Sequence, residues 1–256
     1  MREGTTVILR AMRTAVRIVV VFMSAWSVVG CAADDRSVSA KKSPSESSPR
    51  KAVSLFPDKG EVKGWSVRAW DDVSKPGPAE AKWVVDEEGV LHGSEPRGTW
   101  LVSDMEYGDF VIEYDFKLGE RGNSGLGIRF PGKGDPAFDG LEIQMNDVRY
   151  NEGRDAPNQL TGSFYKAIAP KKQLFKPTEW NHYKITAKGS RIQVELNGGL
   201  VQDVNLAEQN TPVERHDGTM APPLKDRPRR GRLGFQELSR GGAHVLIKNA
   251  KITELD

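Results

Sequence analysis

Alternation of hydrophobic and polar residues is the clearest pattern in the chain. Between residues 109 and 118, every second residue is large and apolar: Phe110, Ile112, Tyr114, Phe116 and Leu118. A period of two places such side chains on one face of a β-strand and the polar ones on the other. The same period recurs in two segments that follow, through Leu126, Ile128 and Phe130 and through Leu141, Ile143 and Met145. Three such strands in close succession predict an antiparallel sheet.

Further strands are predicted toward the C-terminus, at residues 182–187, 191–196, 200–204, 233–238 and 243–255. The turn Asn197-Gly198-Gly199 joins two of these strands as a hairpin, because Asn-Gly accepts the left-handed backbone that such turns require. No capped helical period of about twelve residues follows residue 52. Without strand–helix alternation, a parallel α/β fold is not expected. We therefore expect an all-β fold, an antiparallel two-sheet sandwich of the jelly-roll type.

Polar residues on the face opposite the predicted core mark a candidate site. They are Asn123, Arg129, Glu142, Gln144 and Asn146, rather than the Lys, Thr and Ser residues usual on a solvated sheet. A sheet that curves toward this face would gather them into a cleft. The alternative is an ordinary solvent face with a cross-strand pair between Glu142 and Arg129. The spacing alone leaves both interpretations open.

The first thirty residues have the layout of a secretory signal. Four arginines precede an apolar run from residue 18 to residue 29. This run is shorter than the roughly 20 apolar residues that a membrane-spanning helix needs. It ends in Val28-Val29-Gly30-Cys31, which resembles a bacterial lipobox, and Cys31 is the only cysteine in the chain. We interpret residues 1–30 as a lipoprotein signal peptide and Cys31 as the lipidation site; the alternative is an ordinary cleavage site beside an unrelated cysteine.

The composition changes again after this segment. Residues 31–52 are rich in Ser, Lys, Asp and Pro without an apolar period, which is typical of a flexible tether. Residues 53–256 are expected to form the folded domain. This organisation predicts an exported protein that a lipid anchors to a membrane of the bacterial cell envelope, on its periplasmic or cell-surface face.

The charge balance and the spacing of the histidines indicate which partners and cofactors to expect. The chain has 37 basic and 35 acidic residues, and without its first thirty residues it is slightly acidic. Nucleic acid is not an expected partner, because its phosphates require a strong basic excess. The four histidines, His92, His182, His216 and His244, lack the spacing of a zinc site. No cofactor or metal is predicted, although the sequence leaves open a divalent metal held by carboxylates from distant strands.

An ordered set of short motifs covers most of the predicted domain. The set comprises Trp65-Ser66-Val67, Gly89-Val90-Leu91, Trp100-Leu101-Val102-Ser103, Asp109-Phe110, Asn123-Ser124-Gly125-Leu126-Gly127-Ile128-Arg129, Gly140-Leu141-Glu142-Ile143-Gln144-Met145-Asn146-Asp147, Thr161-Gly162-Ser163-Phe164-Tyr165, Glu179-Trp180-Asn181, Leu196-Asn197-Gly198 and Gly231-Arg232-Leu233-Gly234-Phe235-Gln236. In this order the motifs resemble those of the 3-keto-disaccharide hydrolase family.

This resemblance implies a concanavalin-like or glucanase-like sandwich with a concave, sugar-facing sheet. It also implies a hydrolase that acts on glycosides with a ketone at C3, and hence a functional pairing with a sugar 3-oxidoreductase. The chain departs from the family in one place. Many members continue after the glutamine with His-Gly, whereas Gln236 is followed by Glu237-Leu238-Ser239-Arg240 here. If that histidine takes part in the chemistry, its absence bears on activity.

A ketone at C3 acidifies the proton at C2, so that the glycosidic bond at C1 can break by elimination. This route needs a base and a stabiliser of negative charge, not the paired carboxylates of an ordinary glycosidase. Glu142 is the candidate base, and Arg129 is the candidate stabiliser of charge on the C3 oxygen. Asp147 or Tyr165, both near strand ends, would protonate the departing oxygen. The remaining candidates, for binding sugar hydroxyls, are Asn123, Gln144, Asn146 and Gln236.

Two other functions fit the same residues. A carbohydrate-binding module without catalysis would use the same amides and would not need a carboxylate beside a second proton-transfer group. A structural envelope protein would leave the polar face flat and open. The carboxylate and its surroundings are therefore the feature that separates an enzyme from these alternatives.

Overall fold

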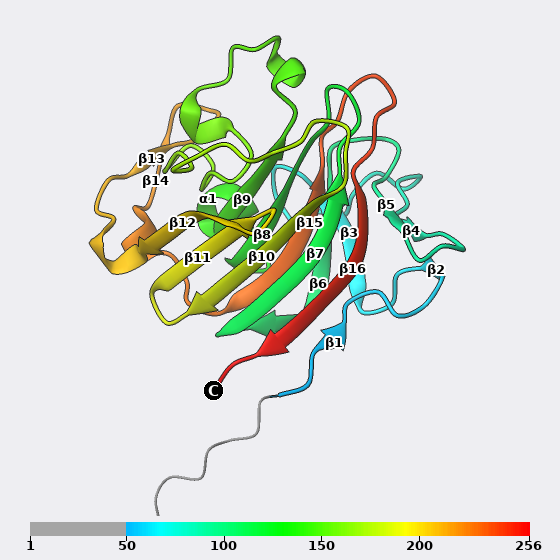
Figure 1. Cartoon of the computed structure of the whole chain (residues 1–256), viewed down its shortest axis with the longest axis horizontal. Helices are drawn as coiled ribbons and strands as arrows, with labels where there is room; N and C mark the ends of the chain where they lie inside the picture. Colours follow the sequence, from blue (N-terminus) through cyan, green and yellow to red (C-terminus); the bar gives the residue numbers. More distant parts are fainter. Residues whose placement is uncertain (1–49) are drawn as a thin grey trace, which may run out of the picture. The chain divides into compact units, whose positions relative to one another are not determined.

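A computed structural model describes residues 50–256 of the chain. The predicted signal peptide and Cys31 lie outside the described residues. Two antiparallel sheets stack face to face in this part of the chain (Figure 1). The prediction of an antiparallel two-sheet β-sandwich is therefore confirmed.

The larger sheet has the strand order β12-β11-β10-β7-β16-β5-β4-β2, and β1 pairs with β16 beside this path. Its strands are β1 (Val53–Ser54), β2 (Gly60–Glu61), β4 (Val84–Val85), β5 (Leu91–His92), β7 (Phe110–Lys117), β10 (Asn181–Lys188), β11 (Arg191–Leu196), β12 (Gly199–Asn205) and β16 (Leu246–Glu254).

The smaller sheet has the order β3-β6-β15-β8-β9. Its strands are β3 (Trp65–Ala69), β6 (Thr99–Tyr107), β8 (Asn123–Phe130), β9 (Leu141–Asn146) and β15 (Gly231–Glu237). A separate hairpin pairs β13 (Val213–Glu214) with β14 (Met220–Ala221). In the described part of the chain, helical structure is limited to α1 (Pro136–Asp139) and four 3₁₀ turns, Val148–Asn151, Pro157–Gln159, Leu206–Glu208 and Leu224–Asp226. Within residues 50–256, no helix has the length and apolar character needed to cross a membrane.

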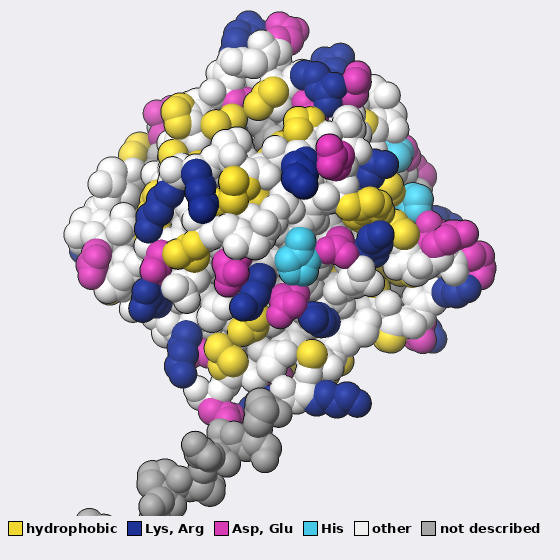
Figure 2. Space-filling model, viewed as in Figure 1, with side chains coloured by type: hydrophobic (Ala, Val, Ile, Leu, Met, Phe, Trp, Pro, Cys, Tyr) yellow, Lys and Arg dark blue, Asp and Glu magenta, His cyan; other side chains and the backbone are white. Residues whose placement is uncertain are grey.

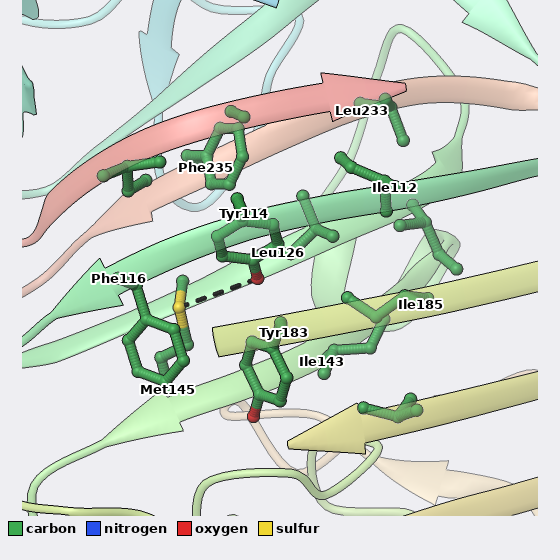
Figure 3. Close-up of a cluster of buried hydrophobic side chains, with 14 of the residues drawn as sticks. Ile112, Tyr114, Phe116, Leu126, Ile143, Met145, Tyr183, Ile185, Leu233 and Phe235 are labelled. Atoms are coloured by element: carbon green, nitrogen blue, oxygen red, sulfur yellow. Dashed lines mark hydrogen bonds between the residues drawn. The ribbon is translucent and has the colours of Figure 1, made fainter. Parts of the chain in front are cut away.

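The core lies between the two sheets, as the alternation predicts. Phe110, Ile112, Tyr114 and Phe116 of β7 are all fully buried. Figure 3 shows side chains of β7 and β10 facing those of β8, β9 and β15 across the interior. The Tyr114 hydroxyl donates to the Met145 sulfur at 3.7 Å. The Tyr183 hydroxyl of β10 donates to the backbone carbonyl of Gln144 in β9 at 2.8 Å. This hydrogen bond ties the larger sheet to the strand that bears the candidate residues.

The alternation does not predict two strands of the smaller sheet, β3 and β6. The first five residues of β6, from Thr99 to Ser103, are all buried. Leu101 faces the main core, while Trp100 and Val102 pack with Val73 and Phe130 on the opposite face of the sheet. Because loops cover the outer face here, the strand has no polar side to produce a period of two.

Candidate functional site

A cavity of about 530 Å³ lies on the outer face of the smaller sheet. This volume is within the range of about 300–1,000 Å³ that is usual for ligand pockets. Strands β8, β9 and β15 form its floor, and the loops that follow β3, β5, β8, β9 and β15 together with the β13–β14 turn form its walls. Five predicted site residues line it, namely Asn123, Glu142, Gln144, Asn146 and Gln236, and Tyr165 makes a sixth. The predicted polar face is thus a walled cavity rather than an open solvent face.

Glu142 is held in the cavity floor by the glycines of the neighbouring strand. It pairs with Gly127 across the β8–β9 ladder, and a Cβ atom on Gly125 would overlap the Glu142 carboxyl group. The side chain is buried, and no hydrogen bond from its carboxyl is found within the described residues. Burial, and secondarily the charge of Asp135, raises the pKa of Glu142 well above its ordinary value. The cavity therefore favours the protonated form of Glu142.

Asp135 is a second carboxyl group in the cavity, which the sequence analysis missed. It caps α1, where its Oδ1 accepts from the Ala137 N–H at 3.0 Å. Burial raises the pKa of Asp135 to about 7; Asp139 adds to this, whereas the Ala137 N–H and Arg215 oppose it. The sequence did contain a signal, because an Asp directly before a Pro is typical of a helix start. With a pKa near 7, this carboxyl group can take up or release a proton at physiological pH.

Tyr165 lies beside Glu142 because its backbone extends the free edge of β9. The Tyr165 N–H donates to the Glu142 carbonyl at 3.0 Å. Burial, and secondarily the charge of Glu142, raises the pKa of Tyr165, so its hydroxyl stays protonated and can donate a hydrogen bond. The ring also contacts His216, with ring centres 5.9 Å apart.

His216 comes from the β13–β14 turn and forms a wall of the cavity with Trp70 and Tyr165. Its ring centre is 6.0 Å from that of Trp70. The neighbouring Arg215 fixes the turn to α1 through its Nη2, which is 2.5 Å from the Asp139 Oδ1. Partial desolvation, reinforced by the charge of Lys166, lowers the pKa of His216 and favours its neutral form. An aromatic wall of this kind suits the apolar face of a ring-shaped ligand.

The predicted amide residues line the floor of the same cavity as Asp135 and Glu142, which we call the carboxyl pair. Gln144 Nε2 donates to Asn123 Oδ1 at 3.4 Å across the two strands. Asn146 uses its Nδ2 to donate to Asp155 Oδ2 at 2.8 Å and thereby positions that carboxylate in the cavity wall. Gln236 of β15 also faces the cavity. The amides thus provide donors and acceptors along one row of the floor.

Arg129 does not join Glu142, and the prediction that the two share a pocket is wrong. The backbone of Arg129 has a φ of 53°, and the β8–β15 register shifts at this point, as in a β-bulge. The bulge ends the alternation and turns the fully buried side chain away from the cavity. Its guanidinium donates to the Gly108 and Gly189 carbonyls at 2.8 and 2.7 Å and to Asp109 Oδ1 at 2.9 Å. Arg129 therefore joins the smaller sheet to the larger one.

Because of the bulge, Phe130 also lies on the opposite face of the sheet from the one that the alternation predicts. The alternation placed Phe130 in the main core with Leu126 and Ile128. Instead, Phe130 packs on the outer face of the sheet with Trp100, Val102 and Val73.

Asp147 is also outside the residues that line the cavity, which contradicts its predicted role as a proton donor. It caps the 3₁₀ turn Val148–Asn151. Its two carboxylate oxygens accept from Arg149 Nε and Nη2 at 2.7 and 2.5 Å. Burial by itself raises the pKa of Asp147, but the hydrogen bonds and charge of Arg149 outweigh it and lower the pKa. Asp147 is therefore an ionised, turn-forming residue.

Glu237, the residue that follows Gln236, points away from the cavity. Its fully buried carboxyl group accepts from the Ser239 and Val245 N–H groups at 2.7 and 2.8 Å. Burial raises its pKa to about 7, although these hydrogen bonds oppose the shift. Leu238 and Arg240 of the same segment line the cavity instead. Among the described residues, no group of three or more His, Cys, Asp or Glu side chains is arranged to hold a metal ion.

The fold and the site together define a β-sandwich protein with a polar cavity on one sheet. Residues 51–253 match the family model described as a 3-keto-alpha-glucoside-1,2-lyase-like domain. The chain belongs to this family, which is the one that the ordered motifs resemble, and it is a carbohydrate-active protein of the hydrolase-like type.

Two similar solved structures are candidate glycosyl hydrolases from Parabacteroides distasonis. One is 24% identical, with a TM-score of 0.64, and the match covers 80% of this chain and 100% of that one. The other is 26% identical, with a TM-score of 0.59, and the match covers 80% of this chain and 94% of that one. No curated protein matches the chain.

Proposed function

We propose that the protein cleaves the glycosidic bond of 3-keto-glycosides by elimination, starting with removal of the proton at C2. The observation that carries this proposal is the presence of a buried carboxyl group, Glu142, and a half-buried one, Asp135, in one cavity lined by amides and aromatic rings. The family description and the similar solved structures support a reaction on a glycoside. A binding module has no need of a carboxyl group desolvated as Glu142 is, since its burial is costly.

Asp135 is the proposed base, which revises the assignment of that role to Glu142. One Asp135 oxygen is fixed by the α1 N-terminus, and the other has no hydrogen bond within the described residues. A base works best when its pKa is close to the pH of the reaction, which applies to Asp135.

Glu142 and Tyr165 are the proposed hydrogen-bond donors. A protonated carboxyl group in an apolar site can stabilise an oxyanion. Glu142 in its neutral form would donate to the C3 oxygen and thus take the role predicted for Arg129. Tyr165, next to it, would protonate the departing oxygen. The amides of Asn123 and Gln144 would bind sugar hydroxyls.

The proposed reaction proceeds in two stages. Asp135 takes the C2 proton, and the electron pair forms an enolate with negative charge on the C3 oxygen. The ketone re-forms as the C1–C2 double bond appears and the C1–O bond breaks, and the departing oxygen receives a proton. Addition of water then places a hydroxyl group on C1 and a proton on C2.

The position of the protein in the cell follows from the sequence alone and is also a proposal. Export and lipidation at Cys31 would hold the domain at a membrane of the cell envelope. There it would meet 3-keto-glycosides formed by oxidation of a sugar hydroxyl, a reaction that a sugar 3-oxidoreductase would supply. A Cys31→Ala variant should then move from the membrane fraction to the soluble fraction.

Paired substrates test the proposed reaction. Each pair consists of a disaccharide with a ketone at C3 and the same disaccharide with a hydroxyl group there, and release of the second sugar is measured by chromatography. We expect cleavage of the ketone only. Cleavage of both at similar rates would indicate an ordinary glycosidase, and binding of sugars without cleavage of either would indicate a carbohydrate-binding module.

A further inference from the structure

Two arginines line the part of the cavity that lies beyond the carboxyl pair. Arg97 Nη2 donates to the Tyr150 hydroxyl at 2.8 Å. The Arg240 guanidinium lies over the same ring, 4.2 Å from its centre. Tyr150 is buried, so it is a fixed support for both side chains. The proposed proton-transfer groups use none of these three residues.

The strand register places the arginines at the opposite end of the cavity floor from Glu142. Glu142 pairs with Gly127, whereas Asn146 pairs with Asn123 at the other end of the same ladder. Four residues of strand separate the two ends by about 13 Å. Arg240 belongs to the Asn123 end, because the N–H of Leu238 donates to the Asn123 carbonyl. Tyr150 belongs there too, since it follows shortly after Asn146.

The positive charge at this end is not balanced by ion pairs. Among the described residues, no carboxylate lies within ion-pair distance of Arg97 or Arg240. The Asp155 carboxylate in the cavity wall accepts hydrogen bonds from Asn146 and Asn151 at 2.8 and 2.6 Å. Glu95, two residues from Arg97, lies 3.6 Å from His244 instead. Two fixed guanidinium groups without carboxylate partners favour an anion.

We propose that this end of the cavity binds an anionic group on the departing part of the substrate. The inference rests on the proposed function, which places the 3-keto sugar at the carboxyl pair and so directs the departing group toward Arg97 and Arg240. The preferred substrates would be acidic 3-keto-glycosides, in which the departing part carries a carboxylate, a sulfate or a phosphate.

Binding of unreactive disaccharides tests this inference without catalysis. The probes contain glucose with a C3 hydroxyl, linked to glucose, glucuronic acid, glucose 6-sulfate or glucose 6-phosphate, and calorimetry gives their dissociation constants. We expect the protein to bind at least one acidic probe about tenfold more tightly than the neutral one. Added salt should reduce this preference, since ions screen exposed charges.

Three variants test whether Arg97 and Arg240 cause the preference for acidic probes. Arg240→Gln and Arg97→Gln should each remove most of the preference for the acidic probe and leave binding of the neutral one unchanged. Arg121→Gln makes the same charge change next to the Arg240 backbone but outside the cavity lining, and should keep the preference.

Equal binding of acidic and neutral probes, or an unchanged preference in both cavity variants, would overturn the inference. These results are separate from the proposed function, because the probes lack the C3 ketone. A protein that prefers acidic probes but cleaves no 3-keto-glycoside would retain the anion site and lose the proposed reaction.

Discussion

The outer faces of the two sheets arrange their charged residues in opposite ways. On the larger sheet, acidic and basic groups form exposed or half-exposed cross-strand pairs, such as His182–Asp115 at 2.7 Å and Lys251–Glu113 at 3.1 Å. Figure 2 shows acidic and basic side chains interspersed on the face seen in that view. On the smaller sheet, Glu142 and Asp135 line a cavity and neither forms an ion pair among the described residues. The same fold thus provides one face that is merely solvated and one that holds reactive groups.

The difference comes from what covers each sheet. Loops and a short hairpin wall in the outer face of β8 and β9, whereas no comparable wall of described residues stands over the ion pairs of β7 and β10. Removing water raises the pKa of a carboxyl group, because a charge is poorly solvated in the interior. Exposed ion pairs contribute little to stability and barely change the chemistry of their members. Burial, more than residue type, therefore separates the candidate site from the rest of the surface.

Removing the carboxylate of Asp135 should have the largest effect on activity. Asp135→Asn retains a side chain that can cap α1 but cannot take up the C2 proton, so we expect kcat/KM to fall by about 10³-fold. Asp115→Asn is the matched control on the other face and should leave kcat/KM unchanged. Steady-state kinetics on a 3-keto-glycoside measure both. An Asp135→Asn variant as active as the control would exclude Asp135 as the base.

Removing Arg129 should destabilise the protein without removing its chemistry. In Arg129→Met the Gly108 and Gly189 carbonyls lose their donor and Asp109 loses its partner. We expect the free energy of unfolding to fall by about 3 kcal/mol. The control Arg191→Met removes an exposed pair with Asp203 and should change stability little. Urea unfolding gives stability, and kcat of the folded protein should remain near wild type; a stable but inactive Arg129→Met would restore Arg129 to the site.

The Arg129 result shows where the sequence was informative and where it was not. Strand β7 was predictable because one of its faces is buried and the other solvated, which produces a strict alternation. The same reasoning failed at Arg129, since a bulge changes the face without changing the pattern of residue types. The first five residues of strand β6 are buried on both faces and show no alternation.

The candidate site was predictable only in part, for a related reason. Glu142, Gln144 and Asn146 follow from the period of β9. Asp135 comes from a loop after β8, and its place in the cavity depends on how α1 packs against the sheet. Arg97 and Arg240 also come from loops. Sequence periodicity has no information on which loops meet over a sheet.

A methyl group on Gly125 should impair the site through Glu142. In Gly125→Ala the added Cβ would overlap the Glu142 carboxyl and force it to move. A displaced oxyanion-hole donor should lower kcat by about 10²-fold, with a smaller change in KM. Gly132→Ala, whose Cβ would lie 3.4 Å from Arg232 Nε, serves as the control outside the cavity. Unchanged kcat in Gly125→Ala would argue against a catalytic role for Glu142.

The pH dependence of stability should also distinguish the two faces. The pKa of Asp135 is raised from 3.8 to about 7, so the folded protein binds more protons than the unfolded chain between these values. Its contribution therefore lowers stability as the pH rises through this range. Asp135→Asn, which cannot ionise, should be more stable than wild type at pH 8 by about 2 kcal/mol, roughly half of what the full shift in pKa corresponds to, because Asp135 is partly exposed to water. The difference should be much smaller at pH 4.5. Denaturant unfolding at the two pH values measures this, and an equal difference at both would contradict the raised pKa.

Substrate labelled with deuterium at C2 tests most directly whether the cavity on the smaller sheet performs proton abstraction. Mass spectrometry follows the label in the released 3-keto sugar, with the unlabelled substrate and a protein-free sample of the product as controls for rate and spontaneous exchange. Elimination predicts that the labelled substrate is cleaved more slowly and that the product has lost its deuterium to water. Cleavage at an unchanged rate, with the deuterium retained at C2, would contradict proton abstraction by Asp135.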